Sequence, residues 1–284
     1  MDLFPHSWPS AVLTLLQALL VALPAAGLPV VLHRWTGRGW ALVLPASIVV
    51  VVGGLAVVPE AASALTWLAL IAIPPLAALT LAWGMHGARW WMAVPVAPLL
   101  VVAIAEEGRR PGQIAALVLT ALSCVALARL LTGAVSRGLG RGGVSALRVG
   151  LIAMAVIDAI LVFSGGLAEP NAVLNAATPA SGLPRLQFVG LEGASMGYGD
   201  VFVAATVGAI LAAEGASRRT QWLAAGAAWI AGALFDQLFR WFDSLPATVP
   251  MAIVLILLGG WRGLSARAGV ETAAPEAGAT ARVA

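Results

Sequence analysis

Long apolar segments separated by short polar connections dominate the amino-acid sequence. An apolar stretch of about 17–25 residues is long enough to cross the hydrocarbon core of a bilayer as a helix. The pattern therefore predicts an all-α polytopic membrane protein, a bundle of nine transmembrane helices. The nine segments are residues 10–32, 40–58, 62–83, 90–105, 113–133, 147–167, 190–213, 221–240 and 246–261.

Composition agrees with a chain that resides in a lipid bilayer. Of its 284 residues, 61% are hydrophobic and 10% are charged, and a soluble domain of this length cannot bury so much apolar surface. The basic pI near 10.4 does not indicate a nucleic-acid partner, because the net charge is only +3. The single cysteine, Cys124, excludes an internal disulfide and a cysteine-based metal site. We expect neither a metal nor a cofactor.

The arginines predict the orientation of the chain. All sixteen basic residues are arginines, and twelve of them fall on one side of the predicted spans or in the C-terminal tail. Because cytoplasmic connections are enriched in basic residues, we expect the N-terminus outside and the C-terminus in the cytoplasm. The first apolar segment has no basic leader and is interpreted as a signal anchor rather than a cleaved signal peptide. The predicted location is a bacterial plasma membrane.

Two of the thirteen acidic residues lie deep within predicted spans. Glu192 and Asp236 fall within about a turn of the outer interface, whereas Asp158 and Asp200 do not. At 1.5 Å per residue, Asp158 lies about 15 Å from the inner boundary and Asp200 about 12 Å from the outer boundary. In a core about 30 Å thick these levels differ by about 3 Å. A carboxyl group at such depth is costly and marks a candidate functional site.

Two facing carboxyl groups suit peptide hydrolysis by general acid/base catalysis. They cannot both ionise at close range, so they share a proton; the ionised group activates a water and the protonated group polarises the peptide. Gly197 and Gly199 leave no side chain beside Asp200, so a substrate backbone can approach it. Tyr198 either hydrogen-bonds near the site or fills space.

The segments around both aspartates resemble those of a known protease family. Val156–Gly165, which contains Asp158, is similar to the first catalytic segment of the signal peptide peptidase and presenilin family of intramembrane aspartyl proteases. Gly197-Tyr198-Gly199-Asp200 matches that family's Gly-x-Gly-Asp, and Leu245-Pro246-Ala247-Thr248 is similar to its Pro-Ala-Leu. Nine spans, with the aspartates on the sixth and seventh, also fit. The N-terminal half is similar by span count alone.

This resemblance implies roles for individual residues. Asp158 and Asp200 would be the catalytic pair, Gly197, Tyr198 and Gly199 would shape the active site, and Pro246, Ala247 and Thr248 would bind substrate. Two positions depart from the family pattern, because Ile157 replaces a tyrosine and Thr248 replaces a leucine.

It also implies an organisation and a class of substrate. Residues 1–145 would form a scaffold of five spans, residues 146–263 the catalytic half, and residues 264–284 a disordered cytoplasmic tail. Substrates would be transmembrane helices of type II orientation or remnant signal peptides.

Three other interpretations remain open. Type IV prepilin peptidases also carry a Gly-x-Gly-Asp motif, but it usually continues with Lys-Leu where this chain has Val201-Phe202. They commonly have fewer spans and an active site nearer the cytoplasm. A proton-coupled transporter would use both aspartates as a relay, and a non-catalytic scaffold would use them as hydrogen-bonding groups between helices.

Overall fold

The computed structural model describes residues 7–258, apart from residues 28, 30–32, 34, 35, 59, 140, 243 and 244. Most of the described chain is helical. The helices are α1 (Trp8–Ala22), α2 (Val43–Val57), α3 (Ala61–Leu79), α4 (Val96–Ala105), α5 (Arg110–Leu139), α6 (Arg141–Phe163), α7 (Ala168–Ala176), α8 (Tyr198–Ala213) and α9 (Arg218–Asp236), followed by a C-terminal helix, Thr248–Leu258. Short 3-10 or π segments are η2 (Arg38–Leu42), η3 (Thr80–Gly84), η4 (Trp90–Ala93) and η5 (Gln237–Arg240), and the strands are β1 (Phe188–Leu191) and β2 (Ala194–Gly197).

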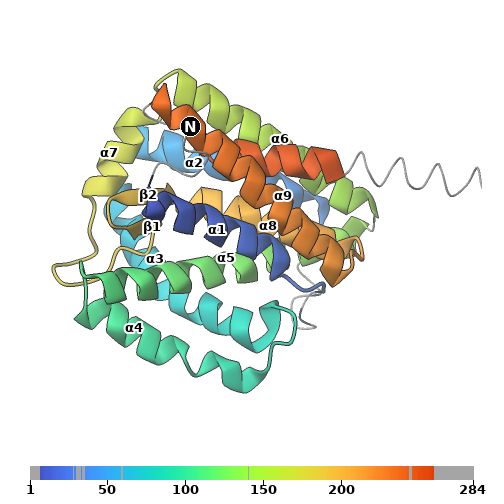
Figure 1. The fold of residues 1–284 in the computed structure, drawn as a ribbon, viewed down its shortest axis with the longest axis horizontal. Coiled ribbons are helices and arrows are strands. Elements are labelled where there is room, and N and C mark those ends of the chain that lie inside the picture. Colours follow the sequence, from blue (N-terminus) through green and yellow to red (C-terminus); the bar gives the residue numbers. More distant parts are fainter. Residues whose placement is uncertain are drawn as a thin grey trace, which may run out of the picture.

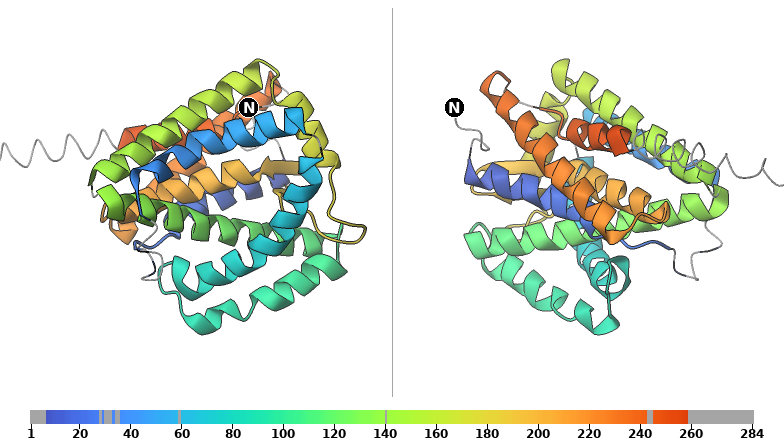
Figure 2. Two further views of the ribbon diagram at one scale, coloured as in Figure 1. Left: turned by 180° about the vertical axis from the view of Figure 1, so that it is seen from behind. Right: turned by 45° about the vertical axis from the view of Figure 1, so that its right-hand side comes forward.

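The long helix α5 crosses the middle of the bundle and contacts helices on several sides (Figures 1 and 2). It packs against α3 and α4 on one side and against α6 and α8 on the other, while α1 packs between α8 and α9. Two hydrophobic clusters follow from this arrangement. One joins buried residues of α1, α5, α6, α8, α9 and the C-terminal helix, and the other joins α3, α4 and α5. The larger cluster therefore unites the predicted scaffold and catalytic halves.

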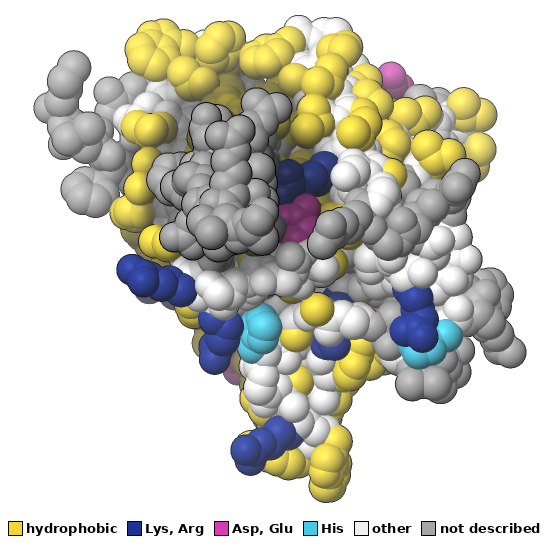
Figure 3. Space-filling model, turned by 90° about the vertical axis from the view of Figure 1, so that its right-hand side faces the viewer, with side chains coloured by type: hydrophobic (Ala, Val, Ile, Leu, Met, Phe, Trp, Pro, Cys, Tyr) yellow, Lys and Arg dark blue, Asp and Glu magenta, His cyan; other side chains and the backbone are white. Residues whose placement is uncertain are grey.

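Three helices are long and apolar enough to cross a membrane. They are Ala61–Gly84, Arg110–Gly138 and Gly142–Phe163, and five shorter apolar helices accompany them in the described part of the chain. Large apolar side chains cover much of the outside; Val57 is 80% exposed and Ile71 is 69% exposed. An apolar surface of this extent fits contact with lipid. Figure 3 shows arginine and histidine side chains gathered at the end of the molecule that it views.

The predicted helix over residues 190–213 is wrong in its first part, which forms a β-hairpin. β1 and β2 pair antiparallel, with Leu191 opposite Ala194. Glu192 and Gly193 between them both have positive φ, 45° and 91°, as the two central residues of a type I′ turn require. Helix α8 consequently begins at Tyr198. Hydropathy alone conceals this hairpin because the flanking residues are apolar.

Arg129 is one of the twelve arginines assigned to the predicted cytoplasmic side. In the structure it lies within α5 and is 7% exposed. Its guanidinium donates to the carbonyl oxygens of Ala26 at 2.7 Å, Gly27 at 3.3 Å and Trp83, and lies over the Trp83 ring. Trp83 lies in the last turn of η3, where a helix leaves carbonyl groups without internal partners, and Ala26 and Gly27 lie in the non-helical segment after α1. The predicted tail, residues 264–284, lies outside the described residues.

The close approach of α1 to α8 predicts a stability effect at Gly208. A Cβ added there would lie 2.4 Å from the Val21 carbonyl oxygen and 2.9 Å from Pro24 Cδ, so Gly208→Ala should lower the free energy of unfolding by about 1–3 kcal/mol. Gly226→Ala is the matched control: its Cβ would meet nothing within 4 Å. That control should leave stability unchanged or raise it by up to about 1 kcal/mol. Tryptophan fluorescence during unfolding in detergent measures both, and equal effects would contradict the packing argument.

Candidate active site

Asp200 lies in the first turn of α8, not near the middle of a long span as the sequence predicted. Its Oδ2 atom accepts a hydrogen bond from the Gly197 N–H at 3.2 Å. A helix leaves its first N–H groups without internal acceptors, so a carboxylate at this position is stabilised. A Cβ on Gly197 would lie 3.2 Å from the same Oδ2. Gly197 therefore keeps the space in which the Asp200 carboxyl group accepts its bond.

Asp158 is held by the start of a different helix. It lies in the second half of α6 and is 7% exposed. The Thr248 hydroxyl donates to Asp158 Oδ2 at 2.6 Å, a length typical of a hydrogen bond to an ionised acceptor. Thr248 is the first residue of the C-terminal helix and is 2% exposed. The residue that departs from the Pro-Ala-Leu pattern is thus the direct partner of Asp158.

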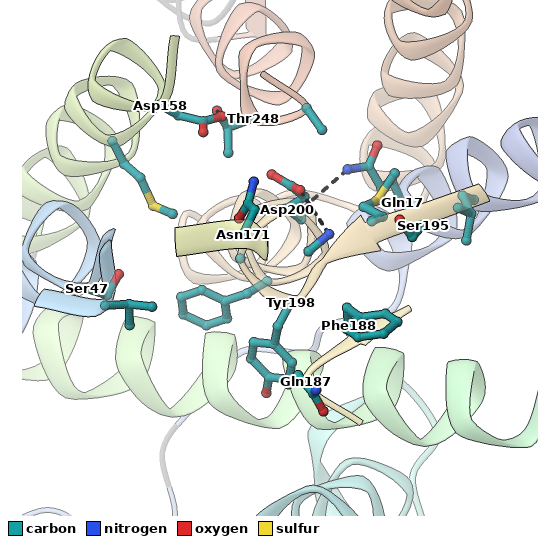
Figure 4. A pocket seen from close by; sticks show the side chains of 18 of the residues that line it. Gln17, Ser47, Asp158, Asn171, Gln187, Phe188, Ser195, Tyr198, Asp200 and Thr248 are labelled. Atoms are coloured by element: carbon teal, nitrogen blue, oxygen red, sulfur yellow. Dashed lines mark hydrogen bonds between the residues drawn. The ribbon is translucent and has the colours of Figure 1, made fainter. Parts of the chain in front are cut away.

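Both aspartates line one cavity of about 1380 Å³. Figure 4 shows Asp158 beside Thr248 and Asp200 across the opening from them. The two carboxyl groups are close enough to interact electrostatically. Other predicted site residues that line this cavity are Gly197, Tyr198, Gly199, Ala247 and Thr248. Pro246 is buried and is not among the lining residues.

Tyr198 borders the cavity, but its hydroxyl points away from Asp200 (Figure 4). The Ser123 hydroxyl donates to the Thr120 carbonyl oxygen at 2.7 Å. Since that bond uses the only hydroxyl hydrogen of Ser123, the Tyr198 hydroxyl donates to Ser123 Oγ at 3.0 Å. Tyr198 also packs against both hydrophobic clusters. These contacts hold the start of α8 on α5. Tyr198 therefore makes a hydrogen bond, to Ser123, and also fills space between the two clusters.

The two glycines of the motif differ in their surroundings. Gly197 is crowded by the Asp200 carboxyl group, whereas a Cβ on Gly199 would meet only Met154 Cε at 3.8 Å, an ordinary contact distance. The protein itself therefore does not require a glycine at position 199. The open space beside Gly199 lies within the cavity.

Sequence reasoning missed other polar residues of the cavity. Gln17 of α1 is 3% exposed and donates to the Asp200 carbonyl oxygen at 3.4 Å. Asp236, expected near the outer interface, is 7% exposed and lines the same cavity as Asp158 and Asp200. A lone amide within the first apolar segment was the available signal for Gln17. Within the described chain, no group of three or more His, Cys, Asp or Glu residues is arranged to hold a metal ion.

Comparison of the chain with protein-family models, with curated proteins and with solved structures finds no match.

The short bond from Thr248 to Asp158 predicts a selective effect on stability. Thr248→Val keeps the shape of the side chain but removes the donor to a buried carboxyl group, so the free energy of unfolding should fall by about 1–3 kcal/mol. Thr248→Ser retains the hydroxyl and should lose less. Repeating Thr248→Val in an Asp158→Leu background should cost clearly less, because the two residues interact directly. An equal cost in both backgrounds would show that the bond does not stabilise the fold.

Proposed function

We propose that this protein is a membrane-embedded aspartic protease with Asp158 and Asp200 as its catalytic pair. The observation that carries the proposal is their convergence: two aspartates from separate helices line one cavity, and each is oriented by a donor to its Oδ2 atom. The cavity of about 1380 Å³ exceeds the roughly 300–1,000 Å³ of a typical small-molecule site. A segment of polypeptide is an occupant of suitable size.

The reaction would proceed by general acid/base catalysis without a covalent intermediate. The ionised aspartate takes a proton from water as the water oxygen attacks the peptide carbonyl carbon. The protonated aspartate gives its proton to the carbonyl oxygen, which forms a tetrahedral diol. As the diol collapses and the C–N bond breaks, the aspartate that was first ionised gives its new proton to the departing nitrogen, and the other aspartate takes the proton of a diol hydroxyl. The products are an amine and a carboxylic acid, and both carboxyl groups return to their starting protonation states. The proposed mechanism invokes neither a metal nor a cofactor.

Strand β2 offers an edge on which an extended substrate can align. The strand lines the cavity and ends directly before α8. Because Leu191 and Ala194 flank a two-residue turn, they form a hydrogen-bonded pair, and the backbone groups of Ser195 point away from β1. The Gly197 N–H is already bonded to Asp200. A peptide strand added at that edge would have its backbone next to Asp200. Backbone pairing of this kind supports cleavage of a locally unwound substrate.

The proposed protease would be embedded in the membrane by most of its helices. Nine helical segments, from α1 to the C-terminal helix with α7 excluded, would cross the bilayer. The basic end shown in Figure 3 would face the cytoplasm, with the N-terminus outside and the C-terminus inside. In this orientation the substrates are membrane helices of type II orientation or remnant signal peptides, and the bilayer itself surrounds the bundle.

One observation favours a type IV prepilin peptidase-like protease as the second candidate. Asp200 lies in the first turn of α8, near a helix end rather than near the middle of a span. An active site nearer the cytoplasm distinguishes this class, so the observation favours it if the start of α8, and not the basic end shown in Figure 3, faces the cytoplasm. A reporter whose cleavage site lies within its apolar helix and a second reporter whose cleavage site lies just outside that helix separate the candidates.

Replacing either aspartate should abolish peptide hydrolysis. Asp158→Ala and Asp200→Ala each remove one proton-transfer group, and cleavage of a membrane-helix reporter in liposomes should fall by about 10²–10⁴-fold. The control Glu60→Ala, on an exposed acid before α3, should cleave at the wild-type rate. A hydroxyl isostere that mimics the tetrahedral diol should bind wild-type protein but neither mutant.

Other results would reassign the site. Full activity in either aspartate variant would remove the catalytic pair. Proton flux across proteoliposomes without proteolysis, lost in both variants, would favour a transporter.

A further inference from the structure

The two helices that carry the aspartates are linked by an ion pair at the end away from the cavity. Arg148 of α6 donates from Nη2 to Oε2 of Glu214, the residue that follows α8, at 2.7 Å. The two side chains are 21% and 20% exposed. Arg148 Nε is buried without a hydrogen-bond partner among the described residues. Loss of the Glu214 carboxylate would therefore leave a mostly buried cation poorly compensated, which is costly.

Helices α6 and α8 make few direct contacts with each other, and each packs more extensively on other helices. Helix α8 packs on α1 and α5, whereas α6 packs on α5 and α2. Asp158 and Asp200 face the cavity, and one approach between the two helices, that of the Met154 side chain to Gly199, is apolar. A contact through the flexible end of a methionine fixes an angle weakly. The ion pair is consequently well placed to set the angle at which α6 crosses α8.

Because the aspartates lie far along the helices from the ion pair, a change in the crossing angle changes the distance between their carboxyl groups. Arg148 precedes Asp158 by ten residues and Glu214 follows Asp200 by fourteen, which correspond to arms of about 15 and 21 Å along the helices. A change of about 10° in the crossing angle would move an aspartate by about 3 Å at the end of such an arm. A misplacement of about 1 Å can already cost about 10²-fold in rate.

We propose that Arg148 and Glu214 are positioning residues that fix the separation of Asp158 and Asp200. Their role in cleavage rests on the proposed protease function, but their effect on geometry does not. A reversed pair should serve equally well, since both side chains are partly exposed at one end of the bundle. An arginine at position 214 is also favourable beside the negative end of the α8 dipole.

The geometric test uses a pair of engineered thiols beside the aspartates. Met154→Cys and Gly199→Cys in a Cys124→Ala background place one thiol on each helix, and thiol-reactive cross-linkers of graded length report their separation. Arg148→Glu should reduce the yield with the shortest cross-linker about fivefold, and the double exchange Arg148→Glu/Glu214→Arg should restore it to within about twofold. Glu106→Arg breaks the exposed Glu106–Arg109 pair and should change nothing.

Separate measurements distinguish a loss of folding from a change in the distance between the two thiols. Size-exclusion and thermal unfolding identify folded variants, and Glu214→Gln replaces Arg148→Glu if the latter does not fold. Unchanged cross-linking in the folded variants, or failure of the double exchange to restore it, would overturn the proposal.

A kinetic measurement then connects the geometry with catalysis. With native Met154, Gly199 and Cys124, Arg148→Glu should lower kcat about tenfold or more with KM little changed, and the double exchange should recover kcat. Wild-type kcat in Arg148→Glu would also overturn the positioning role. If cross-linking responds as expected while wild-type protein cleaves no reporter, the protease proposal fails and the geometric link stands.

Discussion

A carboxyl group can leave bulk water only where hydrogen-bond donors replace the water, and this constraint organises the part of the molecule that carries Asp158 and Asp200. Both aspartates meet it at the beginning of a helix. The Asp200 carboxyl group accepts a hydrogen bond from the Gly197 N–H at the start of α8. The Asp158 carboxyl group accepts one from the Thr248 hydroxyl at the start of the C-terminal helix. Helix starts are the places in an apolar bundle where donors are not already used. The positions of these two helix starts therefore decide where Asp158 and Asp200 are held.

The surrounding elements can be understood as supports for those two helix starts. The hairpin β1–β2 ends the extended chain directly before α8, and its tight turn allows α8 to begin beside the cavity. The Tyr198 hydroxyl and ring secure that beginning to α5. Gln17 of α1 contacts the Asp200 backbone from the other side. Segments remote in sequence thus fix one carboxyl group, while the cavity in front of it remains open.

The same arrangement explains why the site combines rigidity with room for a large occupant. Each aspartate is tied to its own helix start, and both line one cavity. The relation between α6 and α8 then depends on contacts elsewhere, among them the Arg148–Glu214 ion pair. Under the proposed protease function, this opening admits a polypeptide, and the distance between the two acids is set by contacts outside the opening.

The sequence by itself determined the membrane character, the positions of most helices and the choice of Asp158 and Asp200 as candidate site residues. It could do so because apolar segment length and the cost of a buried charge are local properties. Only the tertiary structure decided the rest. The hairpin was concealed by its apolar flanks, so the helical rise used to place Asp200 does not apply to residues 190–197. Thr248, Gln17 and Asp236 reach the cavity through contacts between segments far apart in the chain. Hydropathy carries no information about which helix faces meet, since that is settled by how ten helices pack together across the described chain.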